Sequence, residues 1–518
     1  MSEAPASRTG SLRRNSIANI AGRTASALVW VLVTPFALSH LGQERFAVWS
    51  LFFALGGGVA SLDLGMANGV SRYVALATAR NDRRNLVVVL RRSLTLSACI
   101  GLVWCLLCIA CRGPLMGVFH VPLTLQPEVA RSLVVFAASM FVFSVTQVLN
   151  GALMGFQRLD LSNLCFLSGL VLQTLVLVVG LAAGAGLVAA TAAALCGNAL
   201  SGTLASRLVR RQLRAMPGRE ATEHVTWREL LGFGGAVQAT AACAVGQQLV
   251  NKPLLGMLGQ LVWVTQFELG FRVANAIWSV PTLMQGAVIP AAAHASAGGG
   301  LEPVRAVYDW ACRWIFALAG FVLAGLWLVA PALITLWLGP GHADSIGVTR
   351  TLAVAFIIAT VSGPATAVAR GGGWPLLETW NFAAALGLNV LLSLWLVPRY
   401  GPAGAAIAMA SSYGLAGAWL IVTLHRVLEV HTGPWLVRLA LPRFVLPCAA
   451  AVLLWRLWPA AMPAGKLEAL RQLALQGAAF TVLAAALSWP TGDPASLLAR
   501  LRRGGPRPVP GPVQEVPR

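Results

Sequence analysis

The sequence is dominated by apolar runs, each about the 20 residues that a helix needs to cross a bilayer, separated by short polar or charged segments. Such runs predict transmembrane helices rather than a soluble core. On this pattern we expect helices near 17–38, 46–67, 93–111, 131–151, 163–183, 187–206, 229–250, 260–286, 310–336, 349–369, 380–397, 402–424, 440–458 and 471–489. The fold class is therefore all-α, a polytopic membrane protein with about 14 transmembrane helices.

The longest basic segment between apolar runs, 207–228, falls after the sixth expected helix and divides the pattern into two six-helix bundles around a central cavity, with two additional C-terminal helices. A short repeat agrees with this division, since Leu41-Gly42-Gln43 and Leu258-Gly259-Gln260 each close the first helix of a half. The expected organisation is a cytoplasmic N-terminal segment 1–16, a first bundle 17–206, a cytoplasmic linker 207–228, a second bundle 229–424, two helices within 425–490 and a disordered cytoplasmic tail 491–518.

The composition supports a membrane protein and sets its orientation. Hydrophobic residues make up 57% of the chain and charged residues 11%, whereas a soluble domain carries roughly 25% charged residues. The net charge is +20, and most Lys and Arg residues fall in loops on the side of the N-terminus. By the positive-inside rule, both termini are cytoplasmic. The arginines are then topology signals and contacts to anionic lipids, and nucleic acid is not an expected partner.

Several basic and amide residues lie inside the apolar runs, where polar groups usually face a cavity or a partner. Asn19 and Arg23 are one turn apart on the first helix, Lys252 ends the seventh, and Arg272 and Asn275 lie on the eighth. Guanidinium groups donate paired hydrogen bonds that suit phosphate. We therefore expect these five residues to form a cationic cavity that binds the anionic headgroup of a substrate, such as a diphosphate.

Two carboxylates in the apolar runs are candidates for ion coupling, Glu268 and Asp63. Glu268 lies four residues before Arg272, a spacing that brings both side chains to one helix face. An equally weighted interpretation is that this pair neutralises itself and only holds helices together. Asp63 lies near a helix end, and a structural charge there is the more ordinary interpretation.

No nucleotide-binding loop, zinc-protease motif or paired-aspartate motif is found in the sequence. These absences disfavour a built-in ATPase and a membrane enzyme. We accordingly expect no catalytic residue, no metal site and no cofactor, and an energy source in an ion gradient or the membrane potential.

Four patterned stretches resemble bacterial polysaccharide flippases, the O-antigen and exopolysaccharide exporters of the multidrug/oligosaccharidyl-lipid/polysaccharide superfamily. They are Asn19-x-x-Gly22-Arg23 with Pro35 to Gly65, Asn150-Gly151-x-x-x-Gly155-Phe156-Gln157-Arg158, Phe267-Glu268-Leu269-Gly270-x-Arg272-x-Ala274-Asn275, and Tyr400-Gly401-x-x-Gly404-Ala405-Ala406. The resemblance implies alternating access and a substrate of undecaprenyl-diphosphate-linked oligosaccharide, with a polysaccharide polymerase as a further partner. Three alternatives stay open: a cation-coupled multidrug antiporter of the same fold, a lipid II flippase-like protein, and a non-transporting scaffold of a polysaccharide synthesis complex.

Overall fold

The computed structural model describes residues 5–216, 239–458 and 462–488, without the side chains of 5–28, 58–66, 68 and 488. Within these ranges the chain is helical and contains no strand. Ten of the described helices are long and apolar enough to cross a membrane. This confirms the predicted all-α, polytopic membrane protein.

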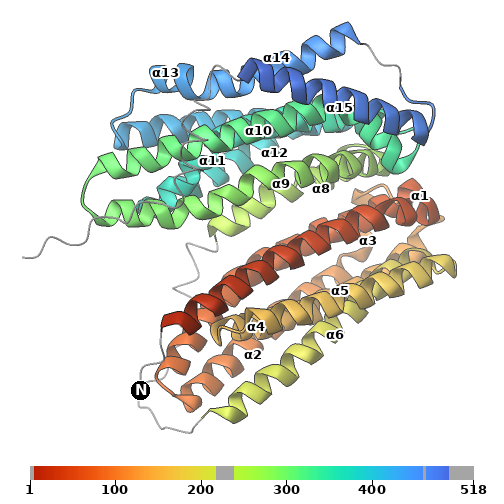
Figure 1. Ribbon diagram of the computed structural model, residues 1–518. Helices are drawn as coiled ribbons and strands as arrows, with labels where there is room; N and C mark the ends of the chain where they lie inside the picture. Colours follow the sequence, from red (N-terminus) through yellow and green to blue (C-terminus); the bar gives the residue numbers. More distant parts are fainter. Residues whose placement is uncertain (1–4, 217–238, 459–461, 489–518) are drawn as a thin grey trace, which may run out of the picture.

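The first bundle contains the N-terminal helices (Figure 1). They are α1 (Pro5–Ala79), α2 (Arg83–Ala110), the short α3 (Arg112–Val118), α4 (Gln126–Gly155), α5 (Leu159–Ala182) and α6 (Gly186–Ala215). The apolar faces of α4, α5 and α6 pack on one another, and α1 and α2 pack on α4. Helix α6 continues nine residues past its predicted end at 206, because the arginines of the expected linker extend the helix out of the apolar run.

The second bundle starts with a helix over 239–249. It continues with α8 (Asn251–Leu258), α9 (Leu261–Ala297), α10 (Leu301–Leu338), α11 (Ala343–Gly371) and α12 (Pro375–Val427). The chain then forms α13 (Thr432–Trp435), the π-helical segment η1 (Leu436–Ala440), α14 (Leu441–Leu457) and α15 (Lys466–Ser488). Helices α14 and α15 pack on α10, so the two additional C-terminal helices lie against the outside of this bundle (Figure 1).

Two long helices each contain a sharp kink at a glycine. Helix α1 joins the runs predicted at 17–38 and 46–67, and Gly42 (φ 72, ψ 174) breaks it between them. Helix α12 joins the runs predicted at 380–397 and 402–424 through Gly401 (φ 55, ψ −134). Both glycines adopt backbone conformations that a residue with a Cβ rarely reaches. Each kink falls between two predicted apolar runs, so each of these helices contains two of the predicted spans.

The repeated Leu-Gly-Gln sequences occupy matching places in the two bundles. Gly42 is the kink of α1, and Gly259 separates α8 from α9. A Cβ on Gly259 would overlap the ring of Trp263, so this break also requires glycine. The same Trp263 ring packs against Gly401. Glycine therefore allows the tight breaks where one span ends and the next begins.

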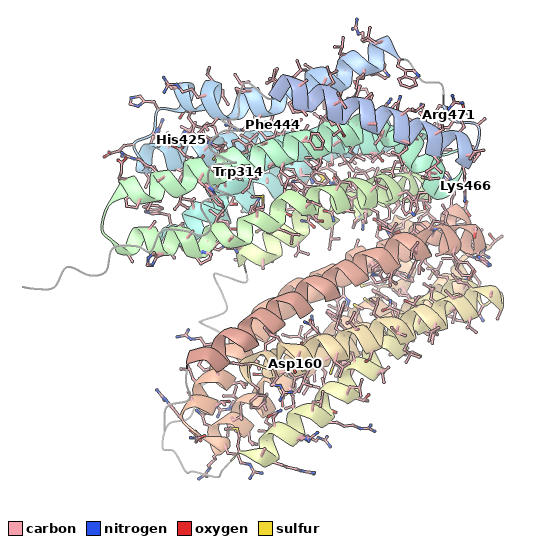
Figure 2. All side chains as sticks on the ribbon, in the orientation of Figure 1. Asp160, Trp314, His425, Phe444, Lys466 and Arg471 are labelled. Atoms are coloured by element: carbon pink, nitrogen blue, oxygen red, sulfur yellow. The ribbon has the colours of Figure 1, made fainter. Side chains whose placement is uncertain are left out.

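The two bundles contact each other mainly through α1, α8 and α9. They lie close together at the right of Figure 1 and further apart at the left. The Thr265 hydroxyl on α9 donates to the Gln43 carbonyl at the α1 kink (2.6 Å), and Trp337 on α10 donates to the Val31 carbonyl (2.7 Å). Lys466 and Arg471 lie at the end where the bundles meet, and His425 lies at the other (Figure 2). The molecule is closed between the bundles at the end that carries Gly42, which we call the Gly42 end.

Candidate functional site

A charged cluster lies on α8 and α9 near the Gly42 end. Glu268 accepts a hydrogen bond from Nε of Arg272 (2.6 Å), and its other carboxylate oxygen lies 2.6 Å from Nζ of Lys252. The side chains of Lys252 and Glu268 are each only 6% exposed. Two cations surround one carboxylate, so the cluster carries a formal charge of +1. Removing charges this deeply from water is costly unless they are paired, and this geometry supplies the pairing.

Arg272 also reaches across to the first bundle. Its Nη1 donates to the Thr34 hydroxyl on α1 (2.7 Å), and its guanidinium lies 5.6 Å from the Trp30 ring centroid and 5.5 Å from that of Phe46. Cations over aromatic faces at this distance are attracted by the ring quadrupole. Arg272 is therefore the group through which the charged cluster of the second bundle contacts the first.

The structure brings together three of the residues singled out in the sequence. Glu268 and Arg272 pair at the predicted four-residue spacing, and Lys252 completes the cluster. Asn275 lies on the same helix beyond Arg272 and is half-buried. The side chains of Arg23, Asn19 and Asp63 lie outside the described residues, and their roles stay predictions.

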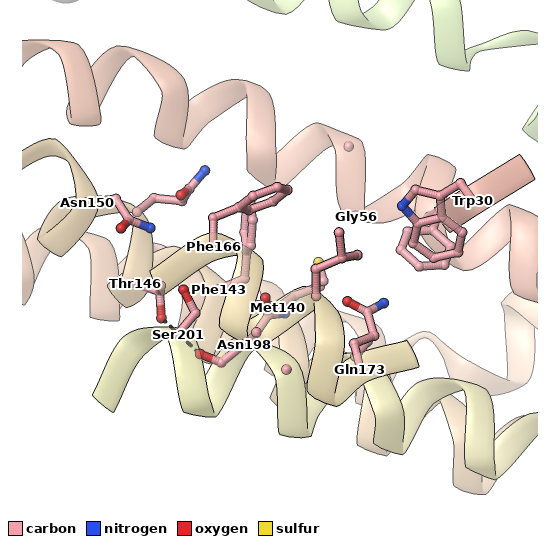
Figure 3. Close-up of a pocket in the computed structure, with 17 residues that line it drawn as sticks. Trp30, Gly56, Met140, Phe143, Thr146, Asn150, Phe166, Gln173, Asn198 and Ser201 are labelled. Carbon is pink, nitrogen blue, oxygen red and sulfur yellow. Dashed lines mark hydrogen bonds between the residues drawn. The ribbon is translucent and has the colours of Figure 1, made fainter. Parts of the chain in front are cut away.

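A second feature is a cavity inside the first bundle, with a volume of about 350 Å³ (Figure 3). Its polar lining consists of Thr146, Gln147, Asn150, Gln173, Asn198 and Ser201, drawn from α4, α5 and α6. Its aromatic lining consists of Trp30, Phe53, Phe143 and Phe166. Among the described residues that line it, none carries a charge. Amides and hydroxyls with aromatic faces suit a neutral, polar and hydroxyl-rich ligand better than an ion.

Some of these polar side chains hydrogen-bond to other residues of the protein, whereas others have no partner among the described residues. Asn198 donates to the Ser139 hydroxyl (3.0 Å), and the carbonyl oxygen of Asn150 accepts from Ser162 (3.4 Å). In contrast, the side-chain amides of Gln147 and Gln173 have no hydrogen-bond partner within the described part of the chain. Polar groups inside a membrane bundle that lack partners usually bind water or a ligand. These two amides are thus the best placed to bind a substrate.

Small residues create the space and the close packing around this cavity. A Cβ on Gly197 would lie 2.7 Å from the Gly169 carbonyl, and the reverse contact has the same length, so α5 and α6 cross at this pair. Gly56 of α1 packs equally tightly against Phe136 and Met140 of α4. Close approach through small residues is the usual way that membrane helices pack.

Analysis of the sequence missed this cavity, although a signal was present. Phe143, Gln147 and Asn150 recur at helical spacing on α4, and Phe166 and Gln173 do so on α5. These amides and aromatic rings stand in otherwise apolar helices, and only the packing of α4, α5 and α6 shows that they face one another.

Trp30 connects the two features. Its ring lines the cavity and also lies under the guanidinium of Arg272. A neutral, amide-lined cavity therefore adjoins a cluster with net positive charge, and the boundary between them is one indole ring on α1.

Comparison with known proteins identifies the architecture. The MatE family model matches residues 20–179, a stretch that begins inside α1 and ends near the end of α5. An inward-facing multidrug resistance MATE family transporter of the MOP superfamily is 18% identical, with a TM-score of 0.66 over 78% of this chain and 94% of that one. The chain has the fold of the MOP-superfamily transporters.

Two further solved structures support the same fold. The lipid II flippase MurJ, in an inward closed conformation, is 11% identical with a TM-score of 0.67, over 92% of this chain and 99% of MurJ. A MOP superfamily transporter from Pyrococcus furiosus, whose binding pocket is described as reversed in polarity, is 19% identical with a TM-score of 0.60, over 81% of this chain and 95% of that one. No curated protein matches the sequence.

Proposed function

We propose that this protein is a flippase for a lipid-linked saccharide, moving undecaprenyl-diphosphate-linked oligosaccharide across the bacterial inner membrane for surface polysaccharide biosynthesis. The observation that carries the proposal is the junction at Trp30, where a neutral amide-lined cavity adjoins a net positive cluster. A saccharide diphosphate needs both environments next to each other. The amides of Gln147 and Gln173 would bind sugar hydroxyls, and the aromatic rings would stack on sugar faces.

In this mechanism Arg272 of the cluster binds the diphosphate by exchanging its contacts in the protein for phosphate oxygens. Arg272 is held by Glu268, by Thr34 and by two aromatic rings when the Gly42 end is closed. When the bundles separate at this end, Thr34 and the rings withdraw, and the guanidinium gains free donors for phosphate oxygens. Arg23, Asn19 and Asn275 would add further donors. Glu268 would be the protonatable group that couples an ion gradient to this exchange, with Asp63 as the second candidate.

The proposed orientation follows from the distribution of basic residues. Both termini would be cytoplasmic, the Gly42 end would be periplasmic, and the anionic lipids of the cytoplasmic leaflet would contact the exposed arginines. The described conformation, closed at the Gly42 end, would then accept substrate from the cytoplasmic side. A polysaccharide polymerase would receive the product. The protein would carry out no catalysis and would need no cofactor.

A cation-coupled multidrug antiporter is the second candidate, and it is favoured by the likeness to a multidrug resistance transporter and by the four aromatic residues of the cavity. Cationic drugs would need a carboxylate near the cavity. Glu268 is linked to the cavity only through Arg272 and Trp30, and it is already shared by two cations. The balance of charge favours the saccharide substrate over the cationic drug.

The experiment that separates these functions measures the lipid-linked saccharide pool in a deletion strain by leaflet-selective labelling and mass spectrometry. Accumulation of one undecaprenyl-linked repeat on the cytoplasmic face supports the flippase. An unchanged pool together with increased drug susceptibility supports the antiporter. Complementation with Arg272→Ala, in a strain where thermal melting and protein level show that the variant is folded, separates transport from scaffolding, because a folded scaffold without transport activity would not need this arginine.

A further inference from the structure

An apolar groove, separate from the amide-lined cavity, lies between the two bundles. It meets the cavity at Gly57. It has a volume of about 380 Å³, and every residue that lines it is apolar or glycine. Ala54 and Gly57 of α1 form the wall on the first bundle. The opposite wall comes from 239–250, from Pro253 at α8, and from Leu386 and Val390 of α12. Gly57 lines both this groove and the amide-lined cavity.

The groove lies at the depth of the hydrocarbon core. Gly57 lies about 22 Å along α1 from the kink at Gly42, at about 1.5 Å per residue, and the core of a bilayer is about 30 Å thick. At this depth an apolar groove is a favourable environment for a hydrocarbon chain, and an unfavourable one for a polar headgroup.

The wall on the second bundle is fixed by hydrogen bonds on the side away from the groove. Gln247 donates to the Ser412 hydroxyl (2.9 Å), and the Ser393 hydroxyl donates to Asn251 (3.2 Å), so the helix over 239–249 and α8 are bound to α12. The wall on the first bundle has no bond of this kind among the described residues. There the contact is Leu249 packed against Gly57, where a Cβ would overlap the leucine side chain.

We propose that this groove holds the polyprenyl chain of the lipid-linked substrate while its saccharide occupies the amide-lined cavity, with Gly57 at the point where the headgroup meets the chain. The proposal rests on the proposed function and adds where the lipid tail leaves the protein. The opposite side, between the first part of α1 and α9, is closed near the Gly42 end by Arg272 and by Thr265. In this proposal the tail leaves where the groove lies, between residues 43–79 of α1 and the helix over 239–249.

The test places the photocrosslinker p-benzoylphenylalanine at Val390, which lines the groove, or at Leu391. Leu391 is the matched control because it is the next residue of α12, is 66% exposed and does not line the groove. The full-length protein is placed in nanodiscs of phosphatidylethanolamine and phosphatidylglycerol with a small fraction of undecaprenyl diphosphate. After irradiation, mass spectrometry gives the ratio of polyprenyl to phospholipid adducts at each position.

We expect the ratio at Val390 to exceed that at Leu391 roughly tenfold, which corresponds to about 1.4 kcal/mol of selective binding. Val245→Trp, which fills the groove, should abolish the enrichment while thermal melting shows that the variant is folded. Equal ratios at both positions, or enrichment of a phospholipid at Val390, would overturn the proposal. The outcome is independent of the saccharide assay: enrichment with an unchanged saccharide pool would contradict the flippase function but leave the groove assignment standing.

Discussion

The buried charges of the α8–α9 cluster each lie next to a partner of opposite charge. Glu268 illustrates this, because its two oxygens contact Lys252 and Arg272 and its side chain is 6% exposed. Removing one member of a buried ion pair leaves the others without compensation, which is far more destabilising than the net strength of the pair. The cluster is therefore both a candidate binding site and a requirement for stability.

We expect Glu268→Gln to destabilise the protein by about 3–5 kcal/mol, because two buried cations lose their counter-charge. Thermal melting in nanodiscs measures this loss. The matched control is Glu302→Gln, since Glu302 is 92% exposed and its pairing with Arg305 at 3.8 Å is screened by water. A melting temperature for Glu268→Gln equal to that of the control would show that the cluster is solvated rather than buried.

Gln173→Leu tests the amide-lined cavity. Its side-chain amide has no hydrogen-bond partner within the described ranges, so its loss should leave thermal stability unchanged. If the amide binds substrate, each lost hydrogen bond should weaken transport by about three- to tenfold. Export by the complemented deletion strain measures the effect. Gln212→Leu, on α6 outside the cavity, is the control, and equal export by both variants would remove Gln173 from the site.

At the scale of elements, glycine determines where apolar runs become separate spans. Gly42 breaks α1 and Gly401 breaks α12, each in a backbone conformation that residues other than glycine rarely adopt. Hydropathy places both breaks correctly, because each apolar run ends at a short segment with polar, charged or turn-forming residues, Gln43 and Glu44 beside Gly42 and Arg399 and Pro402 beside Gly401. It does not show that the chain stays helical up to the kink, since that depends on the local backbone.

Gly42→Ala should cost about 1–3 kcal/mol, the usual strain of a residue with a Cβ in such a conformation. The space around Gly42 is open, so this cost would come from the backbone alone. Gly286→Ala is the matched control: Gly286 lies in α9 with open space and an ordinary helical conformation, and alanine there should stabilise the helix slightly. Chemical denaturation of both variants measures the difference, and equal stabilities would contradict the assigned strain.

At the scale of the whole molecule, the proposed function depends on relative movement of the two bundles. The contacts at the Gly42 end are a few hydrogen bonds and aromatic contacts around Thr34, Gln43 and Val31 of α1. Such an interface can open without unfolding either bundle. The interface is accordingly a gate in the proposed mechanism.

A disulfide across the gate should stop transport. In a variant without the native cysteines, Gln43→Cys with Thr265→Cys bridges α1 and α9, where the Thr265 hydroxyl contacts the Gln43 carbonyl. We expect export to be lost under oxidation and restored by a reductant. Ser97→Cys with Ser144→Cys is the control, because these hydroxyls lie 3.2 Å apart within the first bundle. Normal export by the oxidised Gln43–Thr265 variant would rule out opening at this end.

The sequence by itself determined the membrane-spanning helices, the places where they break, and the pairing of Glu268 with Arg272. All three depend on short-range properties: the length of an apolar run, a glycine at a turn, and a four-residue spacing on one helix. They can be read without knowing how helices pack.

Only the tertiary structure decided which polar residues meet. Lys252 reaches Glu268 from α8, Arg272 reaches Thr34 in the other bundle, and Gln147 and Gln173 face one cavity from α4 and α5. The physical reason is that a single amide in an apolar helix has the same local pattern whether it faces lipid, a neighbour or a cavity. The direction it faces is fixed by close packing at small residues such as Gly169 and Gly197, and this packing joins segments far apart in the chain.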